Sequence, residues 1–459
     1  MQRAPHFNRQ AFQFTKSLIW AYFLLIIFEG VLRKWVFPSL SSPLLFLRDP
    51  ILLAIYVLAL QNKWYLRNIG LIFLIALGFL TLFISIQFNP DRAAVALYGF
   101  RSNFLHLPLI FVIPRVFDKN DVLKVGRFLM ICALPMAVLM AMQFLASPSA
   151  WINTGAGEGA TQIASALGRI RPAGTFSFIV GPVFYFTLVT GFLIYTYFHF
   201  AATNKILIFA TLSATMVAFV VSGSRSLAAA CFLALFLALI SMTAVRPSNL
   251  RRTLTFFLCL GAMSVLAAQF PLISQGYTVL TTRISEANRY EGGAAATLMT
   301  RVFGDFVRPI AIAERVPLVG EGLGMGTIGG SAIMTGNRGF YSNGESESEW
   351  SRHIIESGPL LGYAYIFFRA YLLLYLLRIA VKSGRRGNSL PLVLLGCISQ
   401  ALLLGQWGQS TIAAFTFFTA GMILAACREG EESATPLATH KPQPARVRGT
   451  HRARLRAVR

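Results

Sequence analysis

The sequence predicts an all-α polytopic membrane protein with about twelve transmembrane helices. Of its 459 residues, 55% are hydrophobic and only 13% are charged, whereas a soluble domain carries roughly 25% charged residues. The apolar residues form runs long enough to cross a bilayer, which takes about 20 residues. These runs are continuous rather than alternating, so they favour helices over the strands of a barrel.

Each expected span is a continuous apolar run between short polar segments. In order, the spans are 17–36, 44–61, 68–88, 95–114, 128–147, 178–199, 205–222, 225–245, 253–270, 359–378, 389–406 and 411–427. The first follows a cytoplasmic N-terminus, 1–16, and lacks a signal-cleavage site. Together the spans define a transmembrane domain, 17–427. The Pro- and Arg-rich tail, 428–459, predicts a disordered cytoplasmic segment attracted to anionic lipid.

The net charge is +23, but the Lys and Arg residues do not form a basic stripe of the kind that binds nucleic acid. Lys and Arg concentrate in alternate connections, as positive-inside orientation requires. The predicted inside residues are Lys63, Arg67, Arg115, Lys119, Lys124, Arg127, Lys205, Arg246, Arg251, Arg252, Arg378, Lys382, Arg385 and Arg386. This topology places 148–177 and 271–357 outside. The second segment is far too long for a simple connector, and we expect it to be folded and partly helical.

No cofactor or metal is expected from the motifs. The sequence has no CxxC, no P-loop and no DxD pair, so it favours a metal-independent chemistry that survives chelation. Its cysteines all lie in or next to apolar runs. Gly324, Gly326 and Gly329 match GxGxxG, but they lack a βαβ context and predict a close-packed turn instead.

Two arginines near the outer face are candidates for binding phosphate. The outer segments contain many Arg and almost no Lys, and the planar guanidinium is suited to bidentate phosphate contacts. Arg101 lies inside a predicted span, where a charge marks either a functional site or a side chain that snorkels to headgroups. Arg225 lies in SGSRS, which predicts either an anion-binding turn or a helix hairpin capped by Ser224.

The long outer loop offers further arginines. Arg301, Arg308 and Arg315 recur every seven residues and would share a face on one continuous helix, which Pro309 is expected to interrupt. The alternative is a solvated stripe of mixed charge.

The segment EWSRHIIESGPLLGYAY predicts a short helix at the start of a span. Gly358 and Pro359 should end this helix and begin the next. One face would carry Glu349, Arg352, His353 and Glu356. Such a set can take a proton from a hydroxyl and orient a phosphate. The alternative is a surface helix with intrahelical ion pairs.

The order of these features resembles the O-antigen polymerase and O-antigen ligase superfamily of bacterial membrane glycosyltransferases. The similar pieces, within residues 15–425, are FEGVLRKWVFP at 28–38, YGFRSNFLHLPLIFVIP at 98–114, SGSRS at 222–226, the Arg-containing outer loop, PLVGEGLG at 317–324 and RHIIESGPLLG at 352–362. The resemblance implies a GT-C-like protein of the bacterial inner membrane with its active site facing the periplasm or exterior.

The resemblance also implies a chemistry, used in lipopolysaccharide or other surface polysaccharide biosynthesis. A glycan linked to undecaprenyl or another polyprenyl pyrophosphate would be the donor, and an acceptor sugar hydroxyl would attack with inversion. The pyrophosphate would contact Arg225 and Arg301 or Arg308, with Arg101 and Arg352 as further candidates. His353 would hold or activate the acceptor, with Glu349 or Glu356 as base. We therefore expect His353 and one of the glutamates to be needed for transfer but not for folding.

The polymerase interpretation is preferred because Ile354 stands where ligases commonly have a polar residue. The alternatives are a ligase acting on lipid A-core or another acceptor, and a transporter or flippase for a lipid-linked glycan. The chain lacks the internal repeat that transporters often show.

Overall fold

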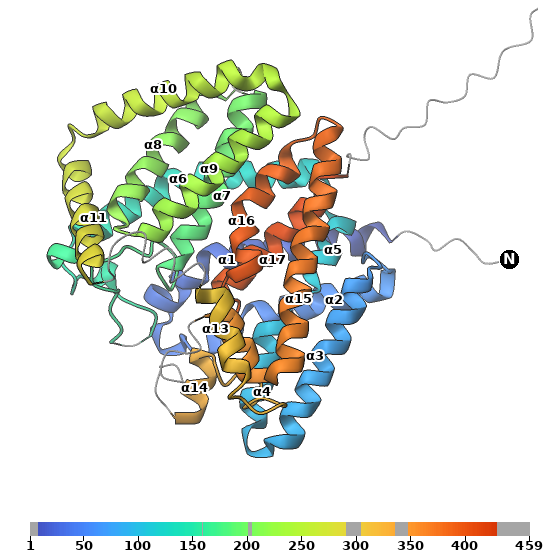
Figure 1. The fold of residues 1–459 in the computed structure, drawn as a ribbon. Helices are drawn as coiled ribbons and strands as arrows, with labels where there is room; N and C mark the ends of the chain where they lie inside the picture. Colours follow the sequence, from blue (N-terminus) through green and yellow to red (C-terminus); the bar gives the residue numbers. More distant parts are fainter. Residues whose placement is uncertain (1–7, 158, 201–203, 291–303, 336–347, 429–459) are drawn as a thin grey trace, which may run out of the picture.

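The computed structural model describes residues 8–157, 159–200, 204–290, 304–335 and 348–428 (Figure 1). Their regular structure is helical, apart from two isolated antiparallel bridges within 154–170. The helices are α1 (Arg9–Val31), α2 (Arg48–Asn62), α3 (Ile69–Phe88), α4 (Ala93–Phe100), α5 (Leu109–Val116), α6 (Lys119–Leu145), α7 (Val180–Phe200), α8 (Lys205–Val221), α9 (Arg225–Val245), α10 (Leu250–Ala267), α11 (Pro271–Tyr290), α13 (Gly304–Ala313), α14 (Ile328–Thr335), α15 (Glu349–Arg385), α16 (Leu390–Leu404) and α17 (Ser410–Ala425).

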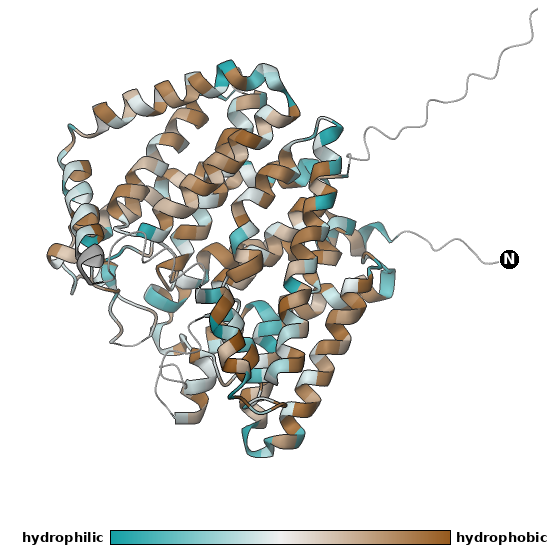
Figure 2. Cartoon of the chain, viewed as in Figure 1, coloured by the Kyte–Doolittle hydropathy of each residue, from teal (hydrophilic) through white to brown (hydrophobic). Residues whose placement is uncertain are grey.

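Eight segments among the described residues are long and apolar enough to cross a membrane, which agrees with the predicted all-α membrane class. Three shorter apolar helices, α8, α16 and α17, correspond to further predicted spans. The expected span 253–270 corresponds to α10, which belongs to neither group. The count of twelve therefore stays a prediction. Figure 2 shows apolar residues along the helix shafts, with hydrophilic residues in the turn between α15 and α16.

Helix α17 lies at the centre of the bundle. Every residue from Ile412 to Ala425 is buried, and α17 contacts α1, α5, α6, α7, α15 and α16. An unpaired charge on such a buried helix would be costly, and its sequence STIAAFTFFTAGMILA has no charged residue. Aromatic rings fill the space around it: Phe418 stacks on Phe23 at 5.1 Å, and Phe417 meets Trp407 edge-on at 4.8 Å.

Helix α15 is two helices that meet at a sharp reversal. Gly358 has φ 73° and ψ 171°, a backbone conformation that is essentially restricted to glycine. The segment before it, 349–357, folds back along the segment after it, so that the rings of His353 and Tyr365 lie 4.0 Å apart. The predicted break at Gly358 and Pro359 is therefore confirmed. The short helix 349–357 is re-entrant, and the span itself starts at Pro359.

A glycine-rich strap, residues 317–327, closes over the end of this re-entrant helix. The N–H groups of Glu321 and Gly322 donate to the carbonyls of Ile355 and Glu356, at 2.8 and 3.1 Å. The strap also passes Gly99 of α4 so closely that a Cβ there would lie 2.4 Å from the nitrogen of Gly324. The GxGxxG sequence thus forms a close-packed turn, as predicted.

The expected outer loop 271–357 is partly helical where it is described, in α11, α13, α14 and the start of α15. Its remaining parts, 291–303 and 336–347, lie outside the described residues, as does the tail after Arg428.

Candidate functional site

The SGSRS turn joins α8 to α9 and is buried from Ser222 to Ser224. Gly223 adopts φ 53°, which lets the chain reverse. Ser224 caps α9, because its Oγ accepts the N–H of Leu227 at 3.3 Å. The predicted cap is confirmed. The cap does not exclude anion binding, because the other N–H groups in the first turn of the 21-residue helix α9 still point toward the turn.

Three arginines from different segments converge on this turn. Arg171, from the loop between α6 and α7, donates Nη2 to the Oγ of Ser224 at 3.4 Å. Arg283, from α11, donates Nη1 to the carbonyl of Gly223 at 3.1 Å. Arg225 is the first residue of α9. We call Arg171, Arg225 and Arg283 the arginine cluster.

The positive charges of the cluster act on one another. Burial, followed by the charges of Arg283 and Arg225, lowers the pKa of Arg171 to about 10. Within the described residues, the Nε of Arg171 is buried and has no hydrogen-bond partner. Positive charges gathered in a partly desolvated place attract an anion.

The other predicted arginines lie elsewhere. Arg101 is buried and paired with Asp49, and its Nη2 donates to the carbonyl of Leu45 at 2.8 Å. It therefore neither snorkels nor presents a free fork. Arg308 is exposed on α13, which continues through Pro309 and ends at Ala313. The expected interruption at Pro309 is wrong, because α13 contains this proline as an interior residue. Arg301 lies outside the described residues.

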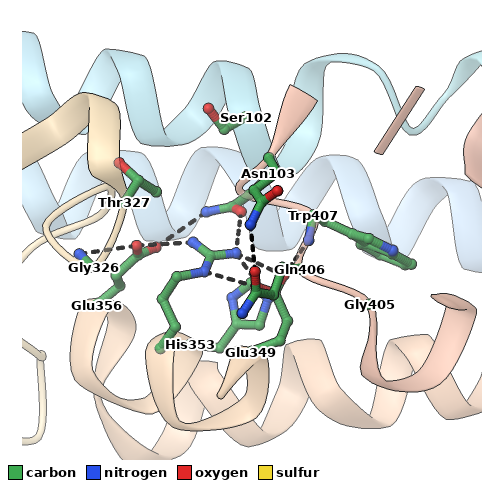
Figure 3. A network of polar contacts seen from close by, with 12 residues as sticks. Ser102, Asn103, Gly326, Thr327, Glu349, His353, Glu356, Gly405, Gln406 and Trp407 are labelled. Carbon is green, nitrogen blue, oxygen red and sulfur yellow. Dashed lines mark hydrogen bonds and ion pairs between the residues drawn. The ribbon is translucent and has the colours of Figure 1, made fainter. Parts of the chain in front are cut away.

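The predicted face of the re-entrant helix is buried inside the protein, and Figure 3 shows the network of polar contacts that it makes. Together with Arg369 from the following span, it forms what we call the charge cluster: Glu349, Arg352, Glu356 and Arg369, exposed by 3, 3, 0 and 0%. The alternative of a surface helix is therefore wrong, although its ion pairs are present. Two carboxylates and two guanidinium groups balance in formal charge, which is what burial requires.

Each Arg352 nitrogen donor group is occupied within this cluster. Its Nε donates to Glu349 Oε2 at 3.0 Å, its Nη1 to Glu356 Oε1 at 2.8 Å, and its Nη2 to Glu349 Oε1 and Asn103 Oδ1, both at 2.8 Å. A phosphate would have to displace a carboxylate to reach it. Arg352 therefore orients its neighbours, and the predicted phosphate contact gains no support from the geometry.

Glu349 is held just as completely. Its Oε1 also lies 3.1 Å from Nη1 of Arg369 and accepts the N–H of Trp407 at 2.9 Å. Arg369 in turn donates to the carbonyls of Ala401, Leu402 and Gly405. These bonds join α15 to the α16–α17 connection.

His353 is 2% exposed, with its Nε2 3.3 Å from Glu349 Oε1 and its ring against Tyr365. Among the sequence candidates on this helix, only Glu349 and Arg352 line the large cavity beside it. His353 and Glu356 lie behind them. Substituting either buried residue should disturb folding as well as transfer, contrary to the sequence-based expectation.

The cavity is about 840 Å³ in volume, which lies within the roughly 300–1,000 Å³ typical of small-molecule sites. Its wall includes Phe46, Tyr98, Gln162, Glu349, Arg352 and Gln409. We call it the Gln162 cavity. Gln162 and Arg171 belong to the same loop.

Comparison with protein-family models, curated proteins and solved structures found no match. The site therefore has to be interpreted from its own chemistry. In the part of the chain that the structure describes, no three His, Cys, Asp or Glu side chains gather to hold a metal ion. Metal independence stays a prediction.

Sequence reasoning missed Arg171, Arg283, Asn103 and Arg369. Arg369 had a detectable signal, since a charge inside the apolar run YIFFRAYLLLY is costly unless it has a buried partner. The two loop arginines were part of the general excess of Arg over Lys, but nothing in their spacing paired them with Arg225.

Proposed function

We propose that this protein is a metal-independent inverting glycosyltransferase of the bacterial inner membrane. It transfers a polyprenyl-pyrophosphate-linked glycan to an acceptor sugar hydroxyl on the outer face. The observation that carries the proposal is the convergence of Arg171, Arg225 and Arg283 on the N-terminus of α9. A pyrophosphate diester is the kind of anion that such a cluster accommodates.

The chemistry follows from charge that develops on the leaving group. The acceptor oxygen forms a bond to the anomeric carbon while the bond from that carbon to the pyrophosphate oxygen breaks, and the electron pair leaves with the pyrophosphate. The acceptor proton ends on the departing pyrophosphate or in water. Guanidinium groups fixed before the reaction stabilise the growing negative charge, which is the largest single contribution in many enzymes.

Polymerisation of lipid-linked repeat units is the preferred activity, with ligation to lipid A-core or another acceptor as the alternative. Ile354, on which the preference rests, is fully buried and belongs to an apolar cluster with Ile312 and Ile366. A hydrophobic residue suits that position better than a polar one. A transporter or flippase for a lipid-linked glycan is the third candidate.

The decisive experiment measures lipid-linked glycans in a strain lacking the gene. A polymerase defect accumulates single lipid-linked repeats, and a ligase defect accumulates full-length lipid-linked chains. A flippase defect leaves the lipid-linked unit facing the cytoplasm. Purified protein incubated with a lipid-linked repeat and excess chelator should form longer glycan and free polyprenyl pyrophosphate. Unchanged donor would contradict the proposal.

A further inference from the structure

The Gln162 cavity differs in charge from the arginine cluster. Two arginines line it, and both are paired with carboxylates. Arg33 lies 3.2 Å from Glu29 through Nη1, and Arg352 is held between Glu349 and Glu356. Neither offers a free fork to a phosphate, so the cavity suits a neutral ligand.

The remaining polar groups of the cavity are neutral hydrogen-bonding side chains. They are amides and hydroxyls, including those of Gln162, Gln406, Gln409, Thr327, Ser410 and Thr411. On the wall, the rings of Phe46 and Tyr98 meet edge-on with centroids 6.4 Å apart. A polar set of amides and hydroxyls beside aromatic faces matches a ligand that has both hydroxyl groups and apolar C–H faces.

One of the two polar atoms of the Gln162 side-chain amide already has a hydrogen-bond partner. Its Oε1 accepts the N–H of Ala173 at 3.0 Å, which fixes the side chain. Its Nε2 is buried and has no hydrogen-bond partner among the described residues. A buried donor without a partner costs free energy comparable to a lost hydrogen bond. A ligand oxygen in the cavity would satisfy it.

The same loop connects the two sites. Beyond Gln162 it turns through an antiparallel bridge between Ala164 and Ile170, and the N–H of Arg171 donates to the carbonyl of Ile163 at 2.9 Å. One short hairpin thus supplies Gln162 to the cavity wall and the guanidinium of Arg171 to the arginine cluster. A neutral ligand and an anion would therefore bind on either side of a single loop.

We propose that the Gln162 cavity binds a neutral saccharide and that Gln162 Nε2 donates a hydrogen bond to one of its oxygens. Naming this saccharide as the acceptor of glycosyl transfer rests on the function proposed above. The binding itself does not depend on that function. The volume gives room for an oligosaccharide of a few sugars, so recognition should extend beyond the sugar that reacts.

Binding can be tested without any donor. The probe is the set of repeat-unit oligosaccharides released by mild acid from the host's own surface polysaccharide, observed by saturation-transfer NMR on the full-length protein in lipid nanodiscs. Gln162→Leu should weaken binding roughly tenfold, as expected for one hydrogen bond. Thr411→Trp, which adds a large ring to the cavity wall, should abolish it. Gln61→Leu, at the exposed end of α2, is the matched control and should bind like the wild type.

Three outcomes would overturn the inference. The first is a saccharide affinity equal to that of the wild type in both the Gln162 and the Thr411 variants. The second is absence of saccharide binding to the wild type. The third is displacement of the saccharide by undecaprenyl phosphate in direct competition, which would assign the cavity to a lipid. Transfer measured in parallel separates the two proposals. Saccharide binding without transfer would contradict the proposed glycosyltransferase function but support saccharide binding in the Gln162 cavity. Transfer with an unchanged acceptor KM in both variants would contradict acceptor binding in the cavity but support the glycosyltransferase function.

Discussion

Glu349 and Arg369 form a buried ion pair of 3.1 Å although they are twenty positions apart in one helical segment. On a straight helix that separation would be about 30 Å. The pair can therefore form only because the chain reverses at Gly358, which brings the re-entrant helix alongside the span. Since Glu349 lines the Gln162 cavity, the pair also connects the cavity wall to Arg369 in the membrane-spanning segment.

The charge cluster should stabilise the fold only while its charges balance. Glu349→Gln leaves one buried guanidinium uncompensated, which typically costs about 3–5 kcal/mol. We expect a markedly lower melting temperature in detergent. The double variant Glu349→Gln with Arg369→Met restores the balance and should melt above the single variant. A double variant that melts below Glu349→Gln would show that charge balance is not what the cluster provides.

The arginine cluster should distinguish a guanidinium from an ammonium. Arg225→Lys keeps the charge but loses the planar fork, and losing one charge-assisted bond of about 2 kcal/mol lowers the rate by tens-fold. Transfer from a lipid-linked donor by the purified variant is the measurement. Arg251→Lys, exposed at the start of α10, is the control and should transfer normally. Wild-type activity in Arg225→Lys would leave that residue only its place in the helix cap.

Binding of the donor should weaken at high pH. The pKa of Arg171 is lowered to about 10, by burial first and then by Arg283 and Arg225. Below that pH the side chain is charged, so affinity should not vary between about pH 8 and about pH 9 on its account. A bound anion raises this pKa, so affinity should fall by up to about tenfold per unit above pH 10.

A short polyprenyl-pyrophosphate-linked sugar is a suitable ligand for this titration, because its diester does not titrate in that range. Arg171→Gln should bind more weakly below about pH 10 and lose the decline. Unchanged binding of this ligand by Arg171→Gln at about pH 8 would exclude Arg171 from the anion site.

The reversal at Gly358 should tolerate no side chain. A Cβ there would lie 2.0 Å from the carbonyl oxygen of Leu318, and the backbone conformation alone costs about 1–3 kcal/mol for other residues. Gly358→Ala should therefore destabilise the protein and reduce the yield of monodisperse material. Gly261→Ala, in α10 with nothing near the added methyl group, should be neutral or slightly stabilising. Equal melting of the two variants would mean that the strap can move away.

The topology can be tested at an exposed position of the strap. Leu318 is 80% exposed, and a single cysteine there should react with a membrane-impermeant maleimide in intact spheroplasts. A cysteine at Arg386, exposed in the turn between α15 and α16, should react only after lysis. Both belong in a background without the native cysteines. The reverse labelling pattern would invert the membrane orientation inferred from the Lys and Arg clusters.

The hydrophobic runs predicted the helices well, because a lipid-facing helix has to be apolar along its whole length. They could not show that residues 349–357 fold back. That outcome depends on tertiary contacts of Gly358 with the strap and of Glu349 with Arg369, and periodicity carries no information about either. For the same reason the shared face of Glu349 and His353 was found, while its burial was not.

The arginine cluster could be predicted from the sequence only in part, for a different reason. Arg225 was identified because it interrupts two apolar runs, a signal that is local in the chain. Arg171 and Arg283 reach the same turn from a loop and from α11. The packing of α11 on α8 and on the loop at residues 166–168 makes them neighbours.

The bonds from Arg369 to the connection between α16 and α17 have a consequence for biogenesis. The re-entrant helix leaves the ribosome long before the carbonyls of Ala401, Leu402 and Gly405 that complete the surroundings of its ionic partner. Until those residues are synthesised, two carboxylates and a guanidinium have no complete set of partners in which to be buried. We therefore expect residues 349–357 to reach their final buried position only after Gly405 has been synthesised. Chains truncated before Ala401 would lack these acceptors for Arg369.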